Sequence, residues 1–346
     1  MTDAAPTPFL DGLVPLVVGT RGDDVDYVTL GAAVTCDAAG EVHRSWGDPE
    51  LPAYLRSSAK PLQVLPFLRR LLPRRLDLGM RAIAVACASH SGEDEHVAAV
   101  TRILDAVGLT EEHLGCGTHD PVRSEEAARV ARGELTLGPL RNNCSGKHAA
   151  MLATCVHEEW DLASYRELEH PLQQECLEIV ATFAGVEPDS IRVAVDNCSL
   201  PTFSLPLRAS ARAAARWREP QGLPEDLAMA STTAVAAMTA QPFMVGGTGR
   251  FDTALMEVTE GRLCVKTGAN GFYIGSYLAE PGAEARGFAL KLAGAEGEAR
   301  KSLAVLGCLE QLGWLDDDER AALADRFPSP LRGCRDQEVG RERFVG

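Results

Sequence analysis

The sequence places two serines and a lysine close together in "RSSAKPLQ", which runs from Arg56 to Gln63. Ser57 and Lys60 are three residues apart, so on a helix both side chains would lie on one face. A serine hydroxyl is a poor nucleophile until a base removes its proton, and a lysine amine is such a base when burial lowers its pKa. The stretch also fits an ordinary helix start, because serine caps helices and Pro61 is tolerated in the first turn. The spacing alone leaves both interpretations open.

A second motif, "VKTG" at residues 265–268, falls on a strand predicted after a long helical segment. Serine β-lactamases and penicillin-binding proteins combine Ser-x-x-Lys at a helix start, a second serine and Lys-Thr-Gly on a late strand. Two serines of "ACASHSGEDEH" are candidates for the second one. Ser91 best fits the N-cap of a helix expected to begin near Asp94, which leaves Ser89 as the partner of Lys266. Lys266 would also be the cation that lowers the pKa of the catalytic base.

A third cluster lies outside that pattern. The stretch "RNNCSGKHAAM" contains Cys144 and Lys147, again three residues apart, and "VAVDNCSLP" contains Asp196 and Cys198. Two thiolates and a neutral amine are donors for a borderline cation such as zinc, and three protein ligands would leave a fourth position open. The alternative is that each cysteine is a small buried apolar residue and that Asp196 forms a turn. His148 is interpreted as a helix residue rather than a ligand.

Composition narrows the class of protein. The chain has 346 residues, of which 45% are hydrophobic and 24% charged, and a formal net charge of -15. This charge argues against nucleic acid or an anionic membrane as partner and leaves a small-molecule substrate. The N-terminal stretch lacks the basic region of a signal peptide, and no apolar run reaches the length of a membrane span. Ten cysteines without a Cys-x-x-Cys pair fit reduced thiols, so a cytoplasmic location is expected.

Lysine is rare in this chain. Of 34 basic residues only five are lysines, namely Lys60, Lys147, Lys266, Lys291 and Lys301. Arginine serves most surface roles but cannot act as a base in water, so each lysine raises the question of why an amine was needed. For Lys301 a biased codon usage is accepted as the explanation.

The elements that must position these residues follow from the hydrophobic patterns. Strands are expected at 14–19, 27–36 and 41–46, and again, after residue 246, within 254–278 and at 287–295. Helices are expected at 56–72 with a kink at Pro66, and at 94–108, 144–160, 170–185, 204–219, 224–240 and 297–313. This order predicts an α+β (α/β/α-like) fold whose sheet is built from both chain ends, with a helical lobe beside it, as in serine β-lactamases. Residues 1–346 would form one domain with a sheet lobe at about 12–56 and 243–346 and a helical lobe at about 57–242.

Five segments together resemble the asparaginase II family, the rhizobial-type or class 3 L-asparaginases. They are "RSSAKPLQ", "CASHSGE", "RNNCSGKHAAML", "DNCSLPTFSLPL" and "GGTGRFDTALMEV…VKTGANGF", and the resemblance runs from about Leu16 to about Gly307. It implies a fold related to serine β-lactamases and glutaminases, a homodimer, and hydrolysis of L-asparagine to L-aspartate and ammonia. The sequence departs from the usual family pattern at "DDVDYV", Asn197, Ser199 and Asn270.

The resemblance also implies the roles of particular residues. The catalytic pairs would be Ser57 with Lys60 and Ser89 with Lys266; one zinc ion per protomer would be held by Cys144, Lys147 and Cys198, with Asp196 close to the metal. Arg56 adjoins the nucleophile and is a candidate contact for the substrate carboxylate, although a surface arginine is an equal alternative. Two other functions stay open: another acyl-serine hydrolase such as a glutaminase, and a non-catalytic zinc-binding relative. Retention of both serines and both lysines argues against the latter.

Overall fold

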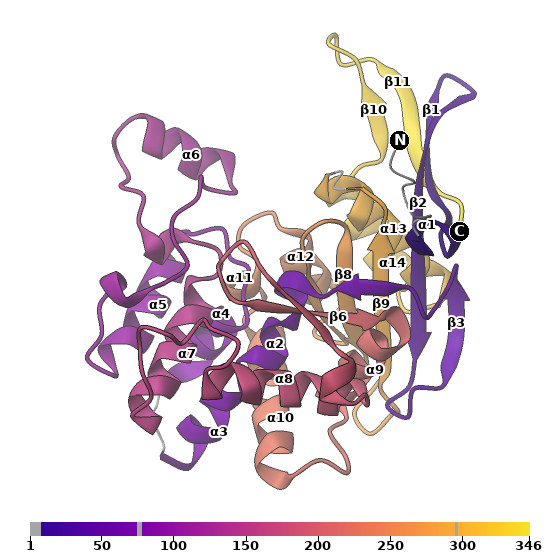
Figure 1. Cartoon of the computed structure of the whole chain (residues 1–346). Helices are drawn as coiled ribbons and strands as arrows, with labels where there is room; N and C mark the ends of the chain where they lie inside the picture. The colour runs from indigo at the N-terminus through magenta and orange to yellow at the C-terminus, as the bar shows by residue number, and fades with distance from the viewer. Residues whose placement is uncertain (1–7, 75–77, 295–296) are drawn as a thin grey trace, which may run out of the picture.

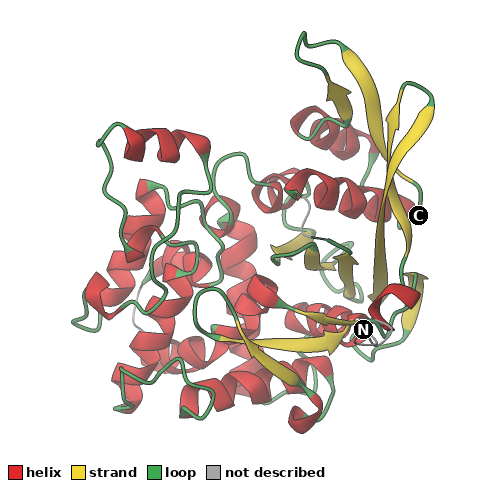
Figure 2. Cartoon of the chain, turned by 45° about the horizontal axis from the view of Figure 1, so that its top comes forward, coloured by secondary structure: helices red, strands yellow, loops and turns green. Residues whose placement is uncertain are grey.

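The computed structural model describes residues 8–74, 78–294 and 297–346. Strands gather on one side of the molecule and most helices on the other (Figures 1 and 2). The N-terminal stretch that lacks the basic region of a signal peptide begins with residues 1–7, which lie outside the described residues. In the part that the structure describes, no helix is both long enough and apolar enough to span a membrane.

The main sheet has eight antiparallel strands drawn from both ends of the chain. The strands are β1 (Val14–Arg21), β2 (Asp24–Cys36), β3 (Val42–Trp46), β7 (Leu263–Thr267), β8 (Phe272–Tyr277), β9 (Arg286–Leu292), β10 (Pro330–Arg332) and β11 (Glu338–Phe344). Their order is β10-β11-β1-β2-β9-β8-β7, and β3 pairs with β2. Strands from the two chain ends pair twice, β1 with β11 and β2 with β9, the latter with Gly31 opposite Leu292 and Cys36 opposite Gly287. The predicted α+β class with a sheet from both ends is confirmed.

Helices cover both faces of this sheet. Helix α9 (Leu207–Arg218) packs against β9, and α13 (Glu298–Gln311) packs on the other side, beside β1 and β11 (Figure 1). The contact with α9 requires a glycine at position 287, because a Cβ atom there would lie 1.7 Å from the backbone oxygen of Ala211. The layers are therefore helix, sheet and helix.

Most of the remaining helices lie between β3 and β7 in the chain and form one region beside the sheet (Figure 1). They are α2 (Lys60–Gln63), α3 (Leu65–Arg74), α4 (Gly79–Ala86), α5 (Asp94–Asp105), α6 (Ser124–Ala131), α7 (Ser145–Glu158), α8 (Pro171–Ala184), α10 (Glu225–Ala240), α11 (Pro242–Val245) and α12 (Phe251–Val258). Two further helices, α1 (Pro8–Asp11) and α14 (Asp317–Arg326), lie near the chain ends, and short 3₁₀ turns include η1 (Arg56–Ala59). The exact lobe boundaries expected from the sequence remain a prediction.

The structure corrects several predicted elements. The strand expected at the start of 254–278 is helix α12, because the helical spacing of Phe251, Leu255 and Val258 begins upstream of that stretch. The helix expected from residue 204 begins at Leu207, since 201–206 is a strand in a small sheet that the sequence did not reveal. That sheet has the order β4 (Pro52–Tyr54), β6 (Pro201–Pro206), β5 (Arg192–Val195). The helix expected at 56–72 is broken at Val64, two residues before the predicted kink.

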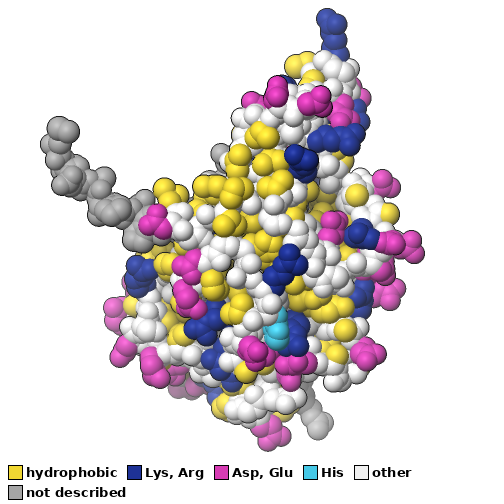
Figure 3. All heavy atoms as spheres, turned by 90° about the vertical axis from the view of Figure 1, so that its right-hand side faces the viewer, with side chains coloured by type: hydrophobic (Ala, Val, Ile, Leu, Met, Phe, Trp, Pro, Cys, Tyr) yellow, Lys and Arg dark blue, Asp and Glu magenta, His cyan; other side chains and the backbone are white. Residues whose placement is uncertain are grey.

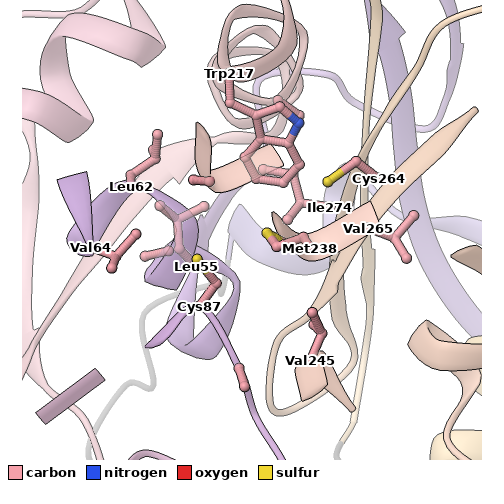
Figure 4. Packing of buried hydrophobic residues seen from close by; sticks show 14 of the residues in the cluster. Leu55, Leu62, Val64, Cys87, Trp217, Met238, Val245, Cys264, Val265 and Ile274 are labelled. Atoms are coloured by element: carbon pink, nitrogen blue, oxygen red, sulfur yellow. The ribbon is translucent and has the colours of Figure 1, made fainter. Parts of the chain in front are cut away.

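A continuous apolar core connects the helical region with the sheet (Figure 4). Trp217 of α9 is fully buried at its centre, and its indole N–H donates to the hydroxyl of Ser276 on β8, 2.5 Å away. Leu62 of α2 and Cys87 after α4 belong to the same buried cluster as Cys264 of β7 (Figure 4). The elements that carry Lys60, Ser89 and Lys266 are thus packed against one another through their apolar neighbours.

The part of the sheet formed by β1, β2 and β3 leaves apolar side chains at the surface. Figure 3 shows hydrophobic side chains gathered in a band on the side of the molecule where β1, β2 and β3 lie. Strand β2 carries the exposed Val25 and Val28. Contiguous apolar surface of this kind is typical of an interaction site.

Gly146 provides a test of the packing that brings α7 against α4. A Cβ atom at Gly146 would lie 2.0 Å from the carbonyl oxygen of Val85, so the two helices approach through this glycine. We expect Gly146→Ala to lower the free energy of unfolding by about 1–3 kcal/mol, because overpacking forces backbone shifts. Unfolding in urea measures this free energy for the parent chain and for the variant. The control Gly138→Ala, whose Cβ would meet only the mobile carboxylate of Glu111 at 3.1 Å, should stay within about 0.5 kcal/mol; equal stability of the two variants would contradict the prediction.

Candidate active site

The centre of the site is the hydroxyl of Ser89, which bridges two buried lysine amines. Lys60 Nζ lies 2.9 Å and Lys266 Nζ 2.8 Å from Ser89 Oγ. Ser89 follows α4 and is fixed by its backbone N–H, which donates to the carbonyl oxygen of Val245 at 3.0 Å. The structure therefore brings together Ser89 and Lys266, the pair that the resemblance implies, and adds Lys60 to the same hydroxyl.

The other implied pair is arranged differently. Lys60 Nζ also contacts the carbonyl oxygens of Ala88 at 2.7 Å and Asn143 at 3.1 Å. Together with Ser89, these contacts occupy three hydrogen-bonding positions on the Lys60 amine. In the described part of the chain, Lys60 makes no hydrogen bond to the Ser57 hydroxyl. Because residues three apart eclipse in a 3₁₀ turn such as η1, the spacing does not separate Ser57 from Lys60. The Lys60 amine is directed away from Ser57 by its contacts to Ala88, Ser89 and Asn143.

Ser57 lies instead at a cavity. It lines a cavity of 380 Å³ together with Cys144, Cys198 and His119, and Ala269, which follows Lys-Thr-Gly, lines another part of its wall. Ser57 is half-buried, whereas Ser89 is only 5% exposed. Of the two candidate serines, Ser57 is therefore the one that lines the cavity.

Arg56 has a left-handed backbone with φ of 52°, which costs a non-glycine residue free energy and often marks a functional turn. Its Nε and Nη2 both lie 2.7 Å from Asp196 Oδ1, and Nη2 donates to Asn197 Oδ1 at 2.8 Å. Burial raises the pKa of the Asp196 carboxyl, but Lys147 and Arg56 outweigh it and hold that pKa below its usual value. Arg56 reaches the cavity already paired with a carboxylate, so an incoming carboxylate would share it.

Both lysines at Ser89 are fully buried, and this changes their chemistry. Burial lowers the pKa of Lys266 to about 7, with Lys60, Arg250 and Lys301 adding to the effect and Asp252 opposing it. Burial also lowers the pKa of Lys60, partly offset by the charge on Cys144. Amines with depressed pKa values can be neutral near physiological pH, which a general base requires.

The two candidate zinc-binding cysteines form a coupled pair. A hydrogen bond from Cys198 holds the pKa of the Cys144 thiol well below its usual value, against burial and with help from Lys60 and Lys147. The same bond, together with burial, raises the pKa of Cys198. Lys147 Nζ lies 3.5 Å from Cys198 Sγ. Burial lowers the pKa of Lys147, but the cysteines and Asp196 raise it by more. Cys144, Lys147 and Cys198 thus converge on one point.

The donor set fits zinc in kind, and the structure gives one of its three separations for comparison with a zinc site. Zinc–sulfur and zinc–nitrogen bonds of about 2.3 and 2.0–2.1 Å at a tetrahedral angle imply a nitrogen–sulfur separation of about 3.6 Å. The separation of 3.5 Å between Lys147 Nζ and Cys198 Sγ is close to that value. Within the described residues, no three histidine, cysteine, aspartate or glutamate side chains are grouped to hold a metal, so the lysine is essential to any such site.

Sequence reasoning missed several groups of the site and misplaced one. Ser91 does not cap α5: its hydroxyl donates to Gly246 O at 3.1 Å, and Glu93 is the N-cap. His119 was not considered, although its Nε2 accepts the backbone N–H of Asn143 at 2.9 Å. Lys301 was attributed to codon usage, yet it is buried behind the Lys-Thr-Gly strand. The scarcity of lysine was the signal that could have identified it.

The depressed pKa of Lys266 predicts a pH-dependent contribution to stability. Between about pH 7 and the unfolded value near 10.4 the unfolded chain binds more protons at this residue than the folded chain. The free energy of unfolding should therefore rise with pH by at most about 1.4 kcal/mol per unit through Lys266. We expect the stability of the parent chain relative to Lys266→Met to increase from about pH 7.5 to about pH 9 in urea titrations. A constant difference would mean that Lys266 keeps an ordinary pKa.

Comparison with known proteins agrees with the motifs. The chain matches the family described as L-asparaginase II over residues 17–344, somewhat beyond the end of the resemblance near Gly307. No curated protein matches the chain. One similar solved structure is a probable glutaminase from Bacillus subtilis complexed with 6-diazo-5-oxo-L-norleucine; the identity is 14% over 82% of this chain and 84% of that chain, with a TM-score of 0.34. Another is a Bacillus glutaminase in the presence of 4.3 M NaCl; the identity is 12% over 82% of this chain and 91% of that chain, with a TM-score of 0.35.

The family match spans nearly the whole chain and covers every candidate site residue, from Arg56 to Lys266. The prediction made from the motifs is thereby confirmed, and the chain belongs to the L-asparaginase II family of amidohydrolases.

Proposed function

We propose that this protein hydrolyses L-asparagine to L-aspartate and ammonia through an acyl-enzyme on Ser57. The observation that carries the proposal is that Ser57 lines a cavity, while the neighbouring Lys60 is joined through Ser89 to Lys266, in a chain of the L-asparaginase II family. A nucleophile, a base and a second amine are the groups that such a reaction needs.

In the first half of the reaction the Ser57 oxygen attacks the side-chain amide carbonyl and its proton passes to Lys60. Lys60 must be neutral for this step, and burial favours that form. Its contacts to two carbonyl oxygens can be N–H donations, and its lone pair then faces Ser89 or, once substrate is seated, Ser57. Catalytic hydrogen bonds commonly tighten only in the substrate complex.

The second amine completes the cycle. Ser89 contacts both Lys60 and Lys266, so a proton can move between the two amines through its hydroxyl. The departing nitrogen takes a proton from this chain of groups and leaves as ammonia. Water then attacks the ester on Ser57 with Lys60 as base, which releases aspartate and restores the serine. A protonated Lys266 would steady the negative charge that develops on the reacting carbonyl.

The metal is part of the proposal. Cys144, Lys147 and Cys198 would hold one zinc ion per protomer, with Asp196 as a hydrogen-bond acceptor beside it. Zinc at this place supplies a Lewis acid next to the cavity. The thiolate character of Cys144 and the contact of Lys147 with Cys198 support this assignment. The chain's own contribution is to keep the donors buried and to orient the carboxylate beside them through Arg56, which donates to Asp196 Oδ1.

A homodimer in the cytoplasm remains the expected form of the protein. The apolar band where β1, β2 and β3 lie supports an interface there (Figure 3). Light scattering of the purified chain, which gives the mass in solution, would decide between monomer and dimer.

An ammonia-release assay tests the proposed substrate. A site that hydrogen-bonds the α-carboxylate and amine rejects one extra methylene only by roughly 10–200-fold, so we expect asparagine to exceed glutamine in kcat/KM by a factor in that range. Arg56 is the candidate carboxylate contact. Preference for glutamine would make the protein a glutaminase, and ammonia from neither amide would favour a non-catalytic zinc-binding relative.

The role of Ser57 is tested by substitution. Ser57→Ala should lower kcat by several orders of magnitude without changing the urea midpoint, since removing one member of a catalytic unit has an effect of that size. Ser89→Ala serves as the comparison. We expect this variant to transfer the acyl group poorly, but the ester on Ser57 should still be detectable by mass spectrometry. Near-full activity in Ser57→Ala, combined with loss in Ser89→Ala, would reverse the two roles.

The zinc site is tested by elemental analysis of protein purified without chelator or affinity nickel. We expect one zinc per chain in the parent protein and a marked loss in Cys198→Ala. Occupancy should also fall as pH drops, because all three donors bind only when unprotonated. Cys176→Ala is a matched control, since this thiol is buried but donates to the backbone oxygen of Gln63 rather than facing the cavity. Metal content that Cys198→Ala does not reduce would leave the site as a pair of buried thiols.

A further inference from the structure

The fourth fully or nearly buried lysine of the chain, Lys301, is not part of the catalytic proposal. It lies on α13 and is only 7% exposed. Its amine donates to the Thr267 hydroxyl and, at 3.1 Å, to the carbonyl oxygen of Gly268. Both acceptors belong to the Lys-Thr-Gly segment that carries Lys266.

A buried carboxylate contacts the same segment from another helix. Asp252 of α12 is 2% exposed, and its Oδ2 accepts the backbone N–H of Thr267 at 2.8 Å. The same oxygen lies 3.9 Å from Lys266 Nζ. The end of β7 is thus held by one buried anion and one buried cation, on two helices that are 49 residues apart at these positions.

The held segment is where the strand approaches the nucleophile. A Cβ atom at Gly268 would lie 2.8 Å from the carbonyl oxygen of Leu55, two residues before Ser57. Ala269, the next residue, lines the cavity. A small displacement of the strand end would therefore move the Lys266 amine and the cavity wall together.

We infer that Lys301 and Asp252 are positioning residues that fix the end of β7, so that the Lys266 amine stays on Ser89 and the cavity wall stays against Ser57. The kinetic part of this inference rests on the proposed function. Neither side chain lines the cavity, so neither is called a catalytic residue.

An ordinary strand end does not need such groups. Burying an ammonium and a carboxylate costs free energy, and apolar side chains of similar volume are often at least as stabilising. A chain with only five lysines among its 34 basic residues keeps one of them here. The free-energy cost of burying Lys301 and Asp252 has a purpose if these two residues set the position and charge state of Lys266.

The two groups act on Lys266 with opposite sign. The charge of Lys301 lowers the pKa of Lys266, whereas that of Asp252 raises it. The other charged groups that face Lys266 are Lys60 of α2 and Arg250, which precedes α12, and both lower it. Removing Lys301 or removing the charge of Asp252 should therefore shift the titration of Lys266 in opposite directions, which a loosened core would not do.

Because the chain has few lysines, the titration of Lys266 can be measured without substrate. Labelling with [ε-¹³C]lysine gives a carbon signal for each of the five lysines, and Lys266→Met identifies the signal of Lys266 by its loss. In the parent protein this signal should titrate near pH 7. In Lys301→Met the midpoint should move to higher pH, and in Asp252→Asn, which keeps an oxygen for the Thr267 N–H, to lower pH.

Kinetics provide the second readout. Lys301→Met should lower kcat for asparagine by about 10–100-fold with KM little changed, because a displacement on the ångström scale has effects of this size and the lost contacts do not touch substrate. Thr267→Val removes the hydroxyl that accepts from Lys301 but no charge, so it should lower kcat without the upward shift of the Lys266 midpoint. Ser302→Ala, which loses only a partly buried hydrogen bond to Glu298 O within α13, should change neither.

The outcomes separate this inference from the proposed function. If Lys301→Met and Asp252→Asn are folded and leave the Lys266 midpoint unmoved, or move it in the same direction, the inference is wrong even if the parent protein is an asparaginase. Shifts of opposite sign in a protein that releases no ammonia would sustain the positioning of Lys266 and overturn only the asparaginase assignment. If Lys301→Met does not fold, Thr267→Val decides: an unchanged kcat would overturn the inference.

Discussion

The constraint on which the rest of the structure depends is the burial of several lysine amines within one small region. Taking an isolated ammonium out of water costs far more free energy than a domain can spare, so each amine must be neutral or surrounded by acceptors. Here the acceptors are backbone carbonyls, the Ser89 hydroxyl and the carboxylate of Asp252. Meeting these needs fixes where α2, the end of α4, the start of α7 and β7 must lie.

On the cavity side, the thiols of Cys144 and Cys198 reduce the cost of burying a charged amine. Cys144 is acidic because buried cations and the Cys198 thiol stabilise its thiolate, and the resulting charge in turn raises the pKa of Lys147. The amines and thiols therefore form one electrostatic unit, in which the lysines at Ser89 have depressed pKa values and the lysine at the thiols does not. Two lysines with the same short spacing to a preceding serine or cysteine thus acquire different chemistry from their neighbours.

The scaffold brings these groups together by close backbone approach. Gly146 lets α7 touch the last turn of α4, and Gly268 lets β7 reach the turn that carries Ser57. The shared core around Trp217 then holds the helical region against the sheet. Each contact lies next to a residue of the site, so packing and chemistry are specified by the same short motifs.

The sequence by itself determined the fold class and the family, and it supplied most of the candidate site residues. Strands at both ends follow from the alternation and β-branched content of segments such as 27–36, and Ser57, Ser89, Cys144 and Cys198 stand in motifs short enough to read directly. Helix α12 was mistaken for a strand because the residue that begins its helical period lies outside the apolar run. Only the tertiary structure decided that Lys60 contacts Ser89, that Arg56 is paired with Asp196, and that Lys301 and Asp252 hold the strand of Lys266. The physical reason is that these contacts join residues from 15 to 140 positions apart, and local spacing carries no information about which buried charges will share a site.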